Sequence, residues 1–329
     1  MRKGGAIALA AAAFGLLALG CGEELKGPRG TPGNPWVIGV TQCGEAEPRG
    51  RQLEKDIRDA ARKHPEIKVT FRGAGNDAAL QETHLRGLIA DRPDAIIVLP
   101  KAPEALTQAI GEAFDKKIPV IVLERKPSGD KYTCLLETND STLGEMAGKQ
   151  LARLIEGKGK VVELQGPAAS DNARERHDGF MRGIQGSEIE NMFDADCAWL
   201  EAEAEREMGL ALGRFDRIDG VFAHNDVMAK GAWLAARAEG RGRQATTRFV
   251  GIGALPAEGI QYVRDGMLAA TIEWPTGGRE ALEAALKILG GERVPKSILL
   301  RIRVFTAANV DKGGEAIDQP VPPPASGGQ

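Results

Sequence analysis

The sequence predicts an α/β protein with two mainly parallel β-sheets, each covered by helices on both faces. Short, continuously apolar segments alternate with amphipathic segments along most of the 329 residues. Strands of a parallel sheet are buried on both faces and therefore have this continuously apolar character. About ten such strand units exceed what one compact sheet usually holds, so we expect two sheets.

The predicted strands are apolar runs bounded by polar or glycine-containing turns. They span residues 36–40, 67–71, 95–99, 120–123, 133–137, 161–164, 220–223, 249–251 and 268–274. The segments between the first strands repeat apolar residues at helical spacing, as Leu53 with Ile57 and Leu106 with Ile110 illustrate. The stretch "TNDST", 138–142, offers a helix N-cap midway along the chain and a crossing point between the two sheets.

The first 20 residues are predicted to be a signal peptide. A short basic segment precedes an apolar run over 6–19, which is shorter than the ~20 residues that a transmembrane helix needs. The run ends in "LALGC", which resembles the lipobox of bacterial lipoproteins, so we expect cleavage before Cys21 and a lipid on its thiol. An ordinary signal peptide with a chance cysteine is the alternative. Residues 21–35 are rich in Gly, Pro and charge and are predicted to be a tether.

Composition and motifs exclude several classes of function. The net charge of −3 gives no electrostatic footprint for nucleic acid. No phosphate-binding loop, dinucleotide fingerprint, GxSxG, HExxH or CxxC motif is present, and the four histidines are scattered. Cys43, Cys134 and Cys197 are odd in number and cannot all pair, so we treat them as structural. We therefore expect no cofactor, no metal and no catalytic residue, with an exported α/β enzyme as the less favoured alternative.

Candidate binding residues are those that follow the predicted strands. In open α/β sheets, ligands bind beyond the carboxyl ends of the strands. The polar positions at these ends are Gln42 to Arg49, Lys101, Glu124 with Arg125, Gly166 to Arg176, Asn225 with Asp226, Gly253 with Ala254, and Trp274.

Four segments in order resemble the type I periplasmic binding proteins for sugars, the group that includes ribose- and galactofuranose-binding proteins. They are "IPVIVLERK", "KVVELQGPAASDNARERHDGF", "DGVFAHNDVMAKGA" and "DGMLAATIEWPTGG", within a resemblance that covers residues 36–305. The resemblance implies two Rossmann-like lobes, a three-segment hinge and a ligand cleft between the lobes.

The resemblance also implies sugar contacts, chiefly from the second lobe. Arg125 and Arg176 match arginines that hold sugar hydroxyls, Asn225 matches an asparagine that does the same, and Trp199 matches an aromatic that stacks on the sugar ring. Arginine forks and amides suit hydroxyls, which both donate and accept hydrogen bonds. Alternatives are a surface position for Arg176, core packing for Trp199 and a helix N-cap for Asn225.

Further candidates depart from the family pattern. Trp274 falls at the last hinge crossing, Glu124 stands where the family usually has Asp, and Glu47 where the ribose binder has Asn. Arg49, with the glycine after it, replaces the aromatic pair usual in the first-lobe loop. With Arg125 and Arg176 it could attract a sugar acid.

Two replacements leave the ligand open. Gly253 stands where the family has a carboxylate, and Leu99 stands where it has Asn or Ser. These departures argue against ribose and leave another pentose, a hexose, a polyol or a sugar acid.

The resemblance predicts the following organisation. Lobe 1 comprises residues 36–138 and 275–301, lobe 2 comprises 139–274 and 302–312, and 313–329 form a disordered tail. We expect an exported, lipid-anchored monomer in the periplasm or at the outer face of the cytoplasmic membrane. It would capture a sugar or polyol and deliver it to an ABC permease. A sensory receptor feeding a chemoreceptor or histidine kinase is the alternative. A LacI-like regulator shares this fold but would carry a DNA-binding headpiece where this chain has a signal peptide.

Overall fold

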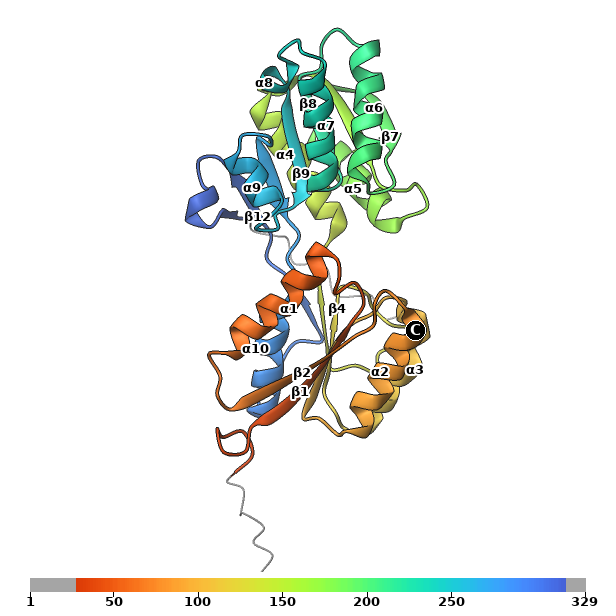
Figure 1. Ribbon diagram of the computed structural model, residues 1–329, viewed down its shortest axis with the longest axis vertical. Coiled ribbons are helices and arrows are strands. Elements are labelled where there is room, and N and C mark those ends of the chain that lie inside the picture. The colour runs from red at the N-terminus through yellow and green to blue at the C-terminus, as the bar shows by residue number, and fades with distance from the viewer. Residues whose placement is uncertain (1–27, 318–329) are drawn as a thin grey trace, which may run out of the picture.

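The computed structural model describes residues 28–317, which form two α/β lobes stacked along the long axis of the molecule (Figure 1). Lobe 1 contains a six-stranded sheet and lobe 2 a seven-stranded sheet. The predicted fold class, with two mainly parallel sheets, is confirmed. The signal peptide and Cys21 lie outside the described residues.

Lobe 1 has the strand order β11-β5-β4-β3-β1-β2, and every neighbouring pair is parallel. Its elements are β1 Trp36–Gln42, α1 Pro48–Ala61, β2 Ile67–Gly73, α2 Ala78–Ala90, β3 Ala95–Leu99, α3 Pro103–Asp115, β4 Val120–Leu123, β5 Cys134–Glu137, α10 Gly278–Leu289 and β11 Ser297–Leu299.

Both faces of this sheet are covered, which explains why its strands are apolar throughout. In β3, Ala95 and Ile97 pack toward α1 and α10, while Ile96 and Val98 pack toward α2 and α3. All four side chains are fully buried. Each buried Ile or Val side chain stabilises the fold by about 1.5 to 3 kcal/mol.

Lobe 2 has the strand order β13-β12-β10-β9-β8-β6-β7, with antiparallel pairing of β12 to β10 and to β13. Its elements are α4 Asp140–Leu154, β6 Lys158–Gln165, α5 Asp171–Gly183, β7 Glu188–Asp196, α6 Glu201–Arg214, β8 Gly220–Ala223, α7 Asp226–Ala238, α8 Arg243–Thr246, β9 Arg248–Gly253, α9 Gly259–Arg264, β10 Ala270–Glu273, β12 Arg303–Thr306, the 3₁₀ helix η1 Val310–Lys312 and β13 Glu315–Ala316.

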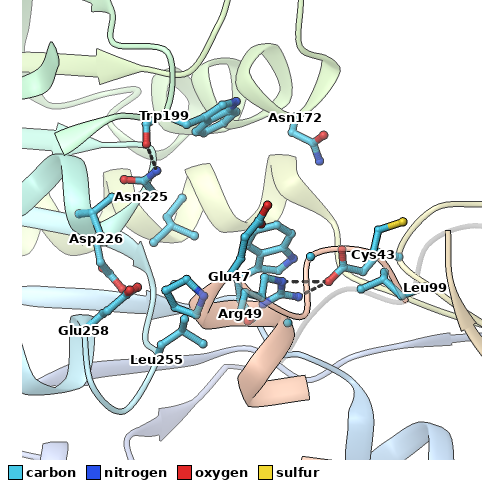
Figure 2. Close-up of a pocket in the computed structure, with 18 of the residues that line it drawn as sticks. Cys43, Glu47, Arg49, Leu99, Asn172, Trp199, Asn225, Asp226, Leu255 and Glu258 are labelled. Carbon is cyan, nitrogen blue, oxygen red and sulfur yellow. Dashed lines mark hydrogen bonds and ion pairs between the residues drawn. The ribbon is translucent and has the colours of Figure 1, made fainter. Parts of the chain in front are cut away.

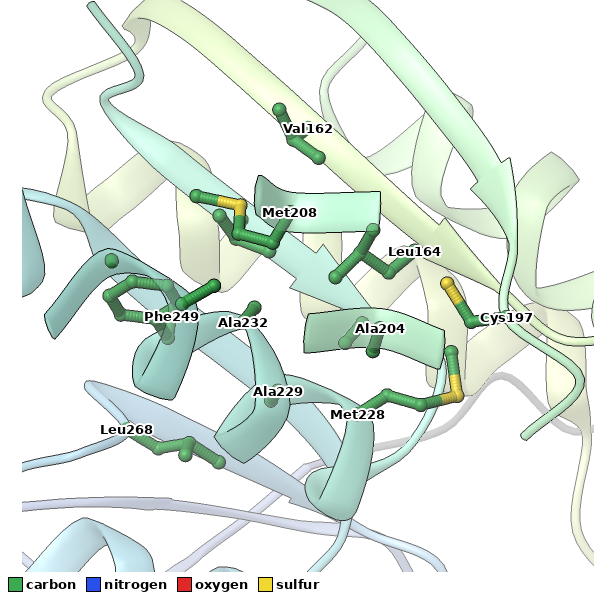
Figure 3. Close-up of a cluster of buried hydrophobic side chains, with 14 of the residues drawn as sticks. Val162, Leu164, Cys197, Ala204, Met208, Met228, Ala229, Ala232, Phe249 and Leu268 are labelled. Atoms are coloured by element: carbon green, nitrogen blue, oxygen red, sulfur yellow. The ribbon is translucent and has the colours of Figure 1, made fainter. Parts of the chain in front are cut away.

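The lobe 2 core also lies on both faces of its sheet. On one face, Met208 of α6 and Met228 of α7 pack against Leu164 of β6 and Phe249 of β9 (Figure 3). On the other face, α4 and α5 pack against strands β6, β8 and β9. This arrangement fixes the start of α5 and the start of α7 at the edge of the sheet that faces lobe 1.

The chain crosses between the lobes three times, as the resemblance implied. The crossings run from β5 to α4, from β10 to α10 and from β11 to β12. At the first crossing the side chain of Asn139 accepts a hydrogen bond from the backbone N–H of Thr142, at 2.8 Å. The N-cap expected within "TNDST" is therefore present.

Several details differ from the expectations. Strands β7, β11, β12 and β13 were not predicted. Strand β7 alternates exposed and half-buried residues at the sheet edge and so lacks an apolar run. The stretch expected to be a disordered tail begins with strand β13, which pairs with β12. At the other end, Arg29 lies in the expected tether, yet its Nε donates to Asp94 at 3.0 Å.

Residues 28–317 contain no candidate membrane-spanning helix, no candidate metal centre and no disulfide. Across residues 28–317 no helix has the length and apolar character needed to cross a bilayer. The same residues contain no group of three or more potential metal ligands. Cys43, Cys134 and Cys197 are buried free thiols, and burial raises the pKa of the Cys197 thiol to about 12.

Candidate functional site

A cavity of about 750 Å³ lies between the lobes, at the carboxyl ends of strands from both sheets. In Figure 2, Glu47 and Arg49 of lobe 1 lie below Trp199 and Asn225 of lobe 2. The eight predicted ligand residues all line this cavity: Glu47, Arg49, Glu124, Arg125, Arg176, Trp199, Asn225 and Trp274.

Arg176 lines the lobe 2 side of the cavity, with only 2% of its side chain exposed. Its Nε donates to Asp140 at 2.7 Å, and its Nη1 donates to the backbone oxygen of His224. The guanidinium lies 4.9 Å from the Trp274 ring centroid and 5.4 Å from that of Trp199. Arg176 is thus not a surface residue, because a buried carboxylate and two aromatic rings fix its position.

Trp199 forms one wall of the cavity, and its main chain is held in an unusual conformation. Its φ is 64°, in the left-handed region that non-glycine residues rarely adopt. The indole lies directly on Gly166, since a Cβ built there would stand 2.2 Å from Cζ2 of Trp199. The Asn225 amide donates to the Trp199 carbonyl at 3.1 Å and accepts from the Met228 backbone N–H at 2.8 Å. Asn225 is therefore a helix N-cap that also borders the cavity.

Arg49 forms hydrogen bonds with the second crossing between the lobes. Its Nε donates to Glu124 at 3.1 Å, its Nη1 to the Trp274 carbonyl at 2.7 Å and its Nη2 to the Pro275 carbonyl at 2.8 Å. The guanidinium stacks 3.6 Å from the Trp274 ring centroid. Because its charge is already matched by Glu124, Arg49 fixes α1 to the second crossing and is poorly placed to attract a sugar acid.

Arg125 and Glu47 present polar groups on the lobe 1 side. Nη1 of Arg125 donates to the carbonyls of Pro100 and Lys101, at 3.1 and 3.0 Å. Glu47 accepts from the Asn76 amide at 2.8 Å. Both side chains keep further donors or acceptors for a ligand.

Asp226 explains why position 253 is glycine. Its carboxyl group bonds the backbone N–H of Ala254 and the hydroxyl of Thr271, each at 2.6 Å. A Cβ on Gly253 would lie 2.6 Å from Oδ2 of Asp226. Because Asp226 fills the space beside this turn, the chain has no room for a family-type carboxylate at 253.

A family model described as a periplasmic binding protein domain matches residues 38–293. The chain belongs to this family. Periplasmic binding proteins of this kind are non-catalytic solute receptors that act outside the cytoplasm, which agrees with the absence of an enzyme motif from the sequence.

Similar proteins share most of the chain's length. A putative rhizopine-binding protein of Rhizobium meliloti is 27% identical over 83% of this chain and 91% of its own. A ribose import binding protein of Salmonella typhimurium is 28% identical over 72% and 81%. The solved fructose-binding periplasmic domain of a hybrid two-component system is 35% identical over 84% of this chain and 93% of its own, with a TM-score of 0.70.

Three residues shape this periplasmic binding protein's cavity without having been singled out from the sequence, although Asn172 lies within the candidate stretch from Gly166 to Arg176. Asp140 balances Arg176, Asn172 donates to Asp140, and Glu258 adds a carboxyl group whose pKa is raised by burial. Within that stretch, Asn172 lies one helical turn before Arg176, on the same face of α5. The other two come from distant segments, and no local pattern marks them.

Burial raises the pKa of Asp226 to about 7, against the hydrogen bonds from Thr271 and Ala254 that lower it. The native state then stays protonated while the unfolded chain ionises near pH 4. The free energy of unfolding should therefore fall as the pH rises from about 4 to 7. Asp226→Asn reproduces the protonated form and does not titrate. We therefore expect its free energy of unfolding, relative to that of the wild type, to rise by about 2 to 4 kcal/mol between pH 4 and pH 7.

Urea unfolding at pH 4, 5.5, 7 and 8 measures this difference. Asp216→Asn, which changes an exposed carboxylate, is the control and should run parallel to the wild type. Parallel curves for Asp226→Asn and wild type would contradict the assignment.

Proposed function

We propose that the protein is the binding component of an ABC importer for a sugar or polyol. The observation that carries this proposal is the convergence of arginine, amide and indole groups from both lobes on one 750 Å³ cavity. Such groups satisfy hydroxyls in pairs and cover an apolar sugar face. Closure of the lobes about the three crossings would exclude water and present the closed surface to the permease.

The charge arrangement favours a neutral ligand. Arg176 is paired with Asp140, and Arg49 with Glu124, so each pair is neutral as a unit. A charged ligand would have to compete with these buried partners, whereas hydroxyls can use the remaining donors and lone pairs. We therefore place neutral sugars and polyols ahead of sugar acids.

A sensory role is the second candidate. The fructose-binding relative is the periplasmic domain of a hybrid two-component system. In either role we propose that the chain is tethered to a membrane by a lipid on Cys21. Radiolabelled palmitate incorporation that is lost in Cys21→Ser would test the anchor.

Ligand-induced thermal stabilisation tests the proposed function. We expect at least one of D-ribose, D-fructose, D-allose, myo-inositol and xylitol to raise the Tm, with D-gluconate less effective. A ligand at 100 times its Kd adds about 2.7 kcal/mol to the free energy of unfolding. Trp199→Ala should weaken the best hit about tenfold or more, because a stacking plate is lost. If no neutral sugar or polyol stabilises the protein, or if a hit is chemically turned over, the proposal is wrong.

A further inference from the structure

A buried carboxylate lies behind the cavity, on strand β6 of the lobe 2 sheet, between β8 and the edge strand β7. Glu163 of β6 is fully buried and accepts hydrogen bonds from the side chains of His177, His224 and Asn191, at 2.9, 2.9 and 3.0 Å. Burial opposes its charge, but the bonds from the two histidines outweigh burial and hold its pKa at about 2. Glu163 is therefore a permanent negative charge beneath the ligand site.

This carboxylate determines the tautomer of His224. The ring is fully buried, and its Nε2 faces Oε1 of Glu163, which can only accept. Nε2 must then carry the proton. Nδ1 remains an acceptor and receives the backbone N–H of Gly166, at 3.3 Å. Burial lowers the pKa of His224, so the ring stays neutral at physiological pH.

His224 supports two of the lobe 2 residues that line the cavity, Trp199 and Arg176. Gly166, which its ring holds, is the surface on which the Trp199 indole lies. The carbonyl of His224 accepts from Nη1 of Arg176. One residue that lines no part of the cavity therefore supports two residues that do.

We propose that His224 is a positioning residue for ligand binding, with Glu163 fixing the tautomer that lets it support Gly166 beneath Trp199. The inference rests on the proposed function, because it concerns affinity at the same cavity. His177 bonds the same carboxylate from the solvent side, through Nδ1, which also lies 3.1 Å from Nε2 of Gln165. Its ring makes no hydrogen bond to Gly166, so it is the comparison residue for the tests below.

Two amide substitutions separate the two ring nitrogens. Asn carries its oxygen near the place of Nδ1, so His224→Asn keeps an acceptor for Gly166 and loses the donor to Glu163. Gln carries its amide nitrogen near the place of Nε2, so His224→Gln keeps the donor to Glu163 and loses the acceptor. We expect His224→Gln to weaken binding about tenfold and His224→Asn by less than about threefold.

The unfolding free energies should show the opposite order, since His224→Asn leaves the buried charge of Glu163 with one donor fewer. Calorimetric titration with the neutral sugar or polyol that gives the largest thermal shift measures Kd, and urea unfolding measures stability. His177→Gln is the matched control: it should lower stability and leave Kd unchanged.

Nitrogen-15 NMR of the wild type provides a readout that needs no ligand, and it should show Nδ1 of His224 unprotonated. A protonated Nδ1 would overturn the proposal. Affinity losses that follow the order of the stability losses, or unchanged Kd values in both His224 variants, would also overturn it. If the wild type binds none of the sugars, the proposed function fails, while the tautomer measurement still tests the support of Gly166.

Discussion

Replacing Arg176 with alanine is expected to abolish measurable sugar binding and to lower the free energy of unfolding by about 3 to 5 kcal/mol. The side chain is 2% exposed and its ion-pair partner Asp140 is 8% exposed. Removing the guanidinium leaves that carboxylate buried and without its cation. It also removes the cation that lies near both the Trp199 and Trp274 rings.

A neighbouring arginine provides the control. Arg174 lies in the same helix and forms an exposed ion pair with Asp171, so Arg174→Ala should change stability by less than about 1 kcal/mol and leave Kd unchanged. The double change of Arg176→Met with Asp140→Leu removes both buried charges. It should recover much of the lost stability and none of the binding. Calorimetric titration of these variants measures Kd, and urea unfolding measures their stability. Sugar binding retained by Arg176→Ala would show that Arg176 is not part of the binding site.

The central strands of both lobes were predictable because their burial on two faces leaves a local signature, whereas β11, β12 and β13 were not predicted. Ile96 and Ile97 pack on opposite faces of one sheet, so the sequence shows an unbroken apolar run. The edge strand β7 has no such run, since neither of its faces is fully covered, and it was missed. Burial thus determines which elements a single sequence reveals.

The positions of most candidate site residues were predictable from the strand ends, and that of Trp199, which follows the missed strand β7, only from the family resemblance; their partners were not predictable. Arg49 was expected to attract a ligand, yet its charge is satisfied by Glu124, 75 positions away in the sequence. Arg176 was expected to face sugar hydroxyls, and it is also held by Asp140 from another helix. Local patterns indicate which side chains reach a cleft, whereas the pairing of charges depends on how distant segments come together in the folded protein.

One local sequence pattern in α4 and α5 could have predicted how these two helices pack. Both helices carry glycines four residues apart, in "GEMAG" from Gly144 and "GFMRG" from Gly179. A Cβ on Gly144 would lie 2.0 Å from the carbonyl oxygen of Arg176, and one on Gly179 would lie 2.0 Å from that of Ser141. The two helices therefore touch backbone to backbone at the turn that carries Arg176.

Gly144→Ala is accordingly expected to cost about 3 kcal/mol, because the clash is with backbone and only a shift of α5 can relieve it. The Tm should fall by about 6 to 12 °C. Any protein that remains folded should bind sugar more weakly, since the shift moves Arg176 away from Asp140. Scanning calorimetry and titration on the same samples measure both effects.

Gly209→Ala is the matched control on α6, where a Cβ has nothing within 4 Å. There alanine should stabilise the protein by about 0.5 to 1 kcal/mol, through helix propensity and lower entropy of the unfolded chain. The same chemical change should thus have opposite signs at two helical glycines. If Gly144→Ala proved as harmless as Gly209→Ala, the close contact of α4 with α5 could not be what positions Arg176.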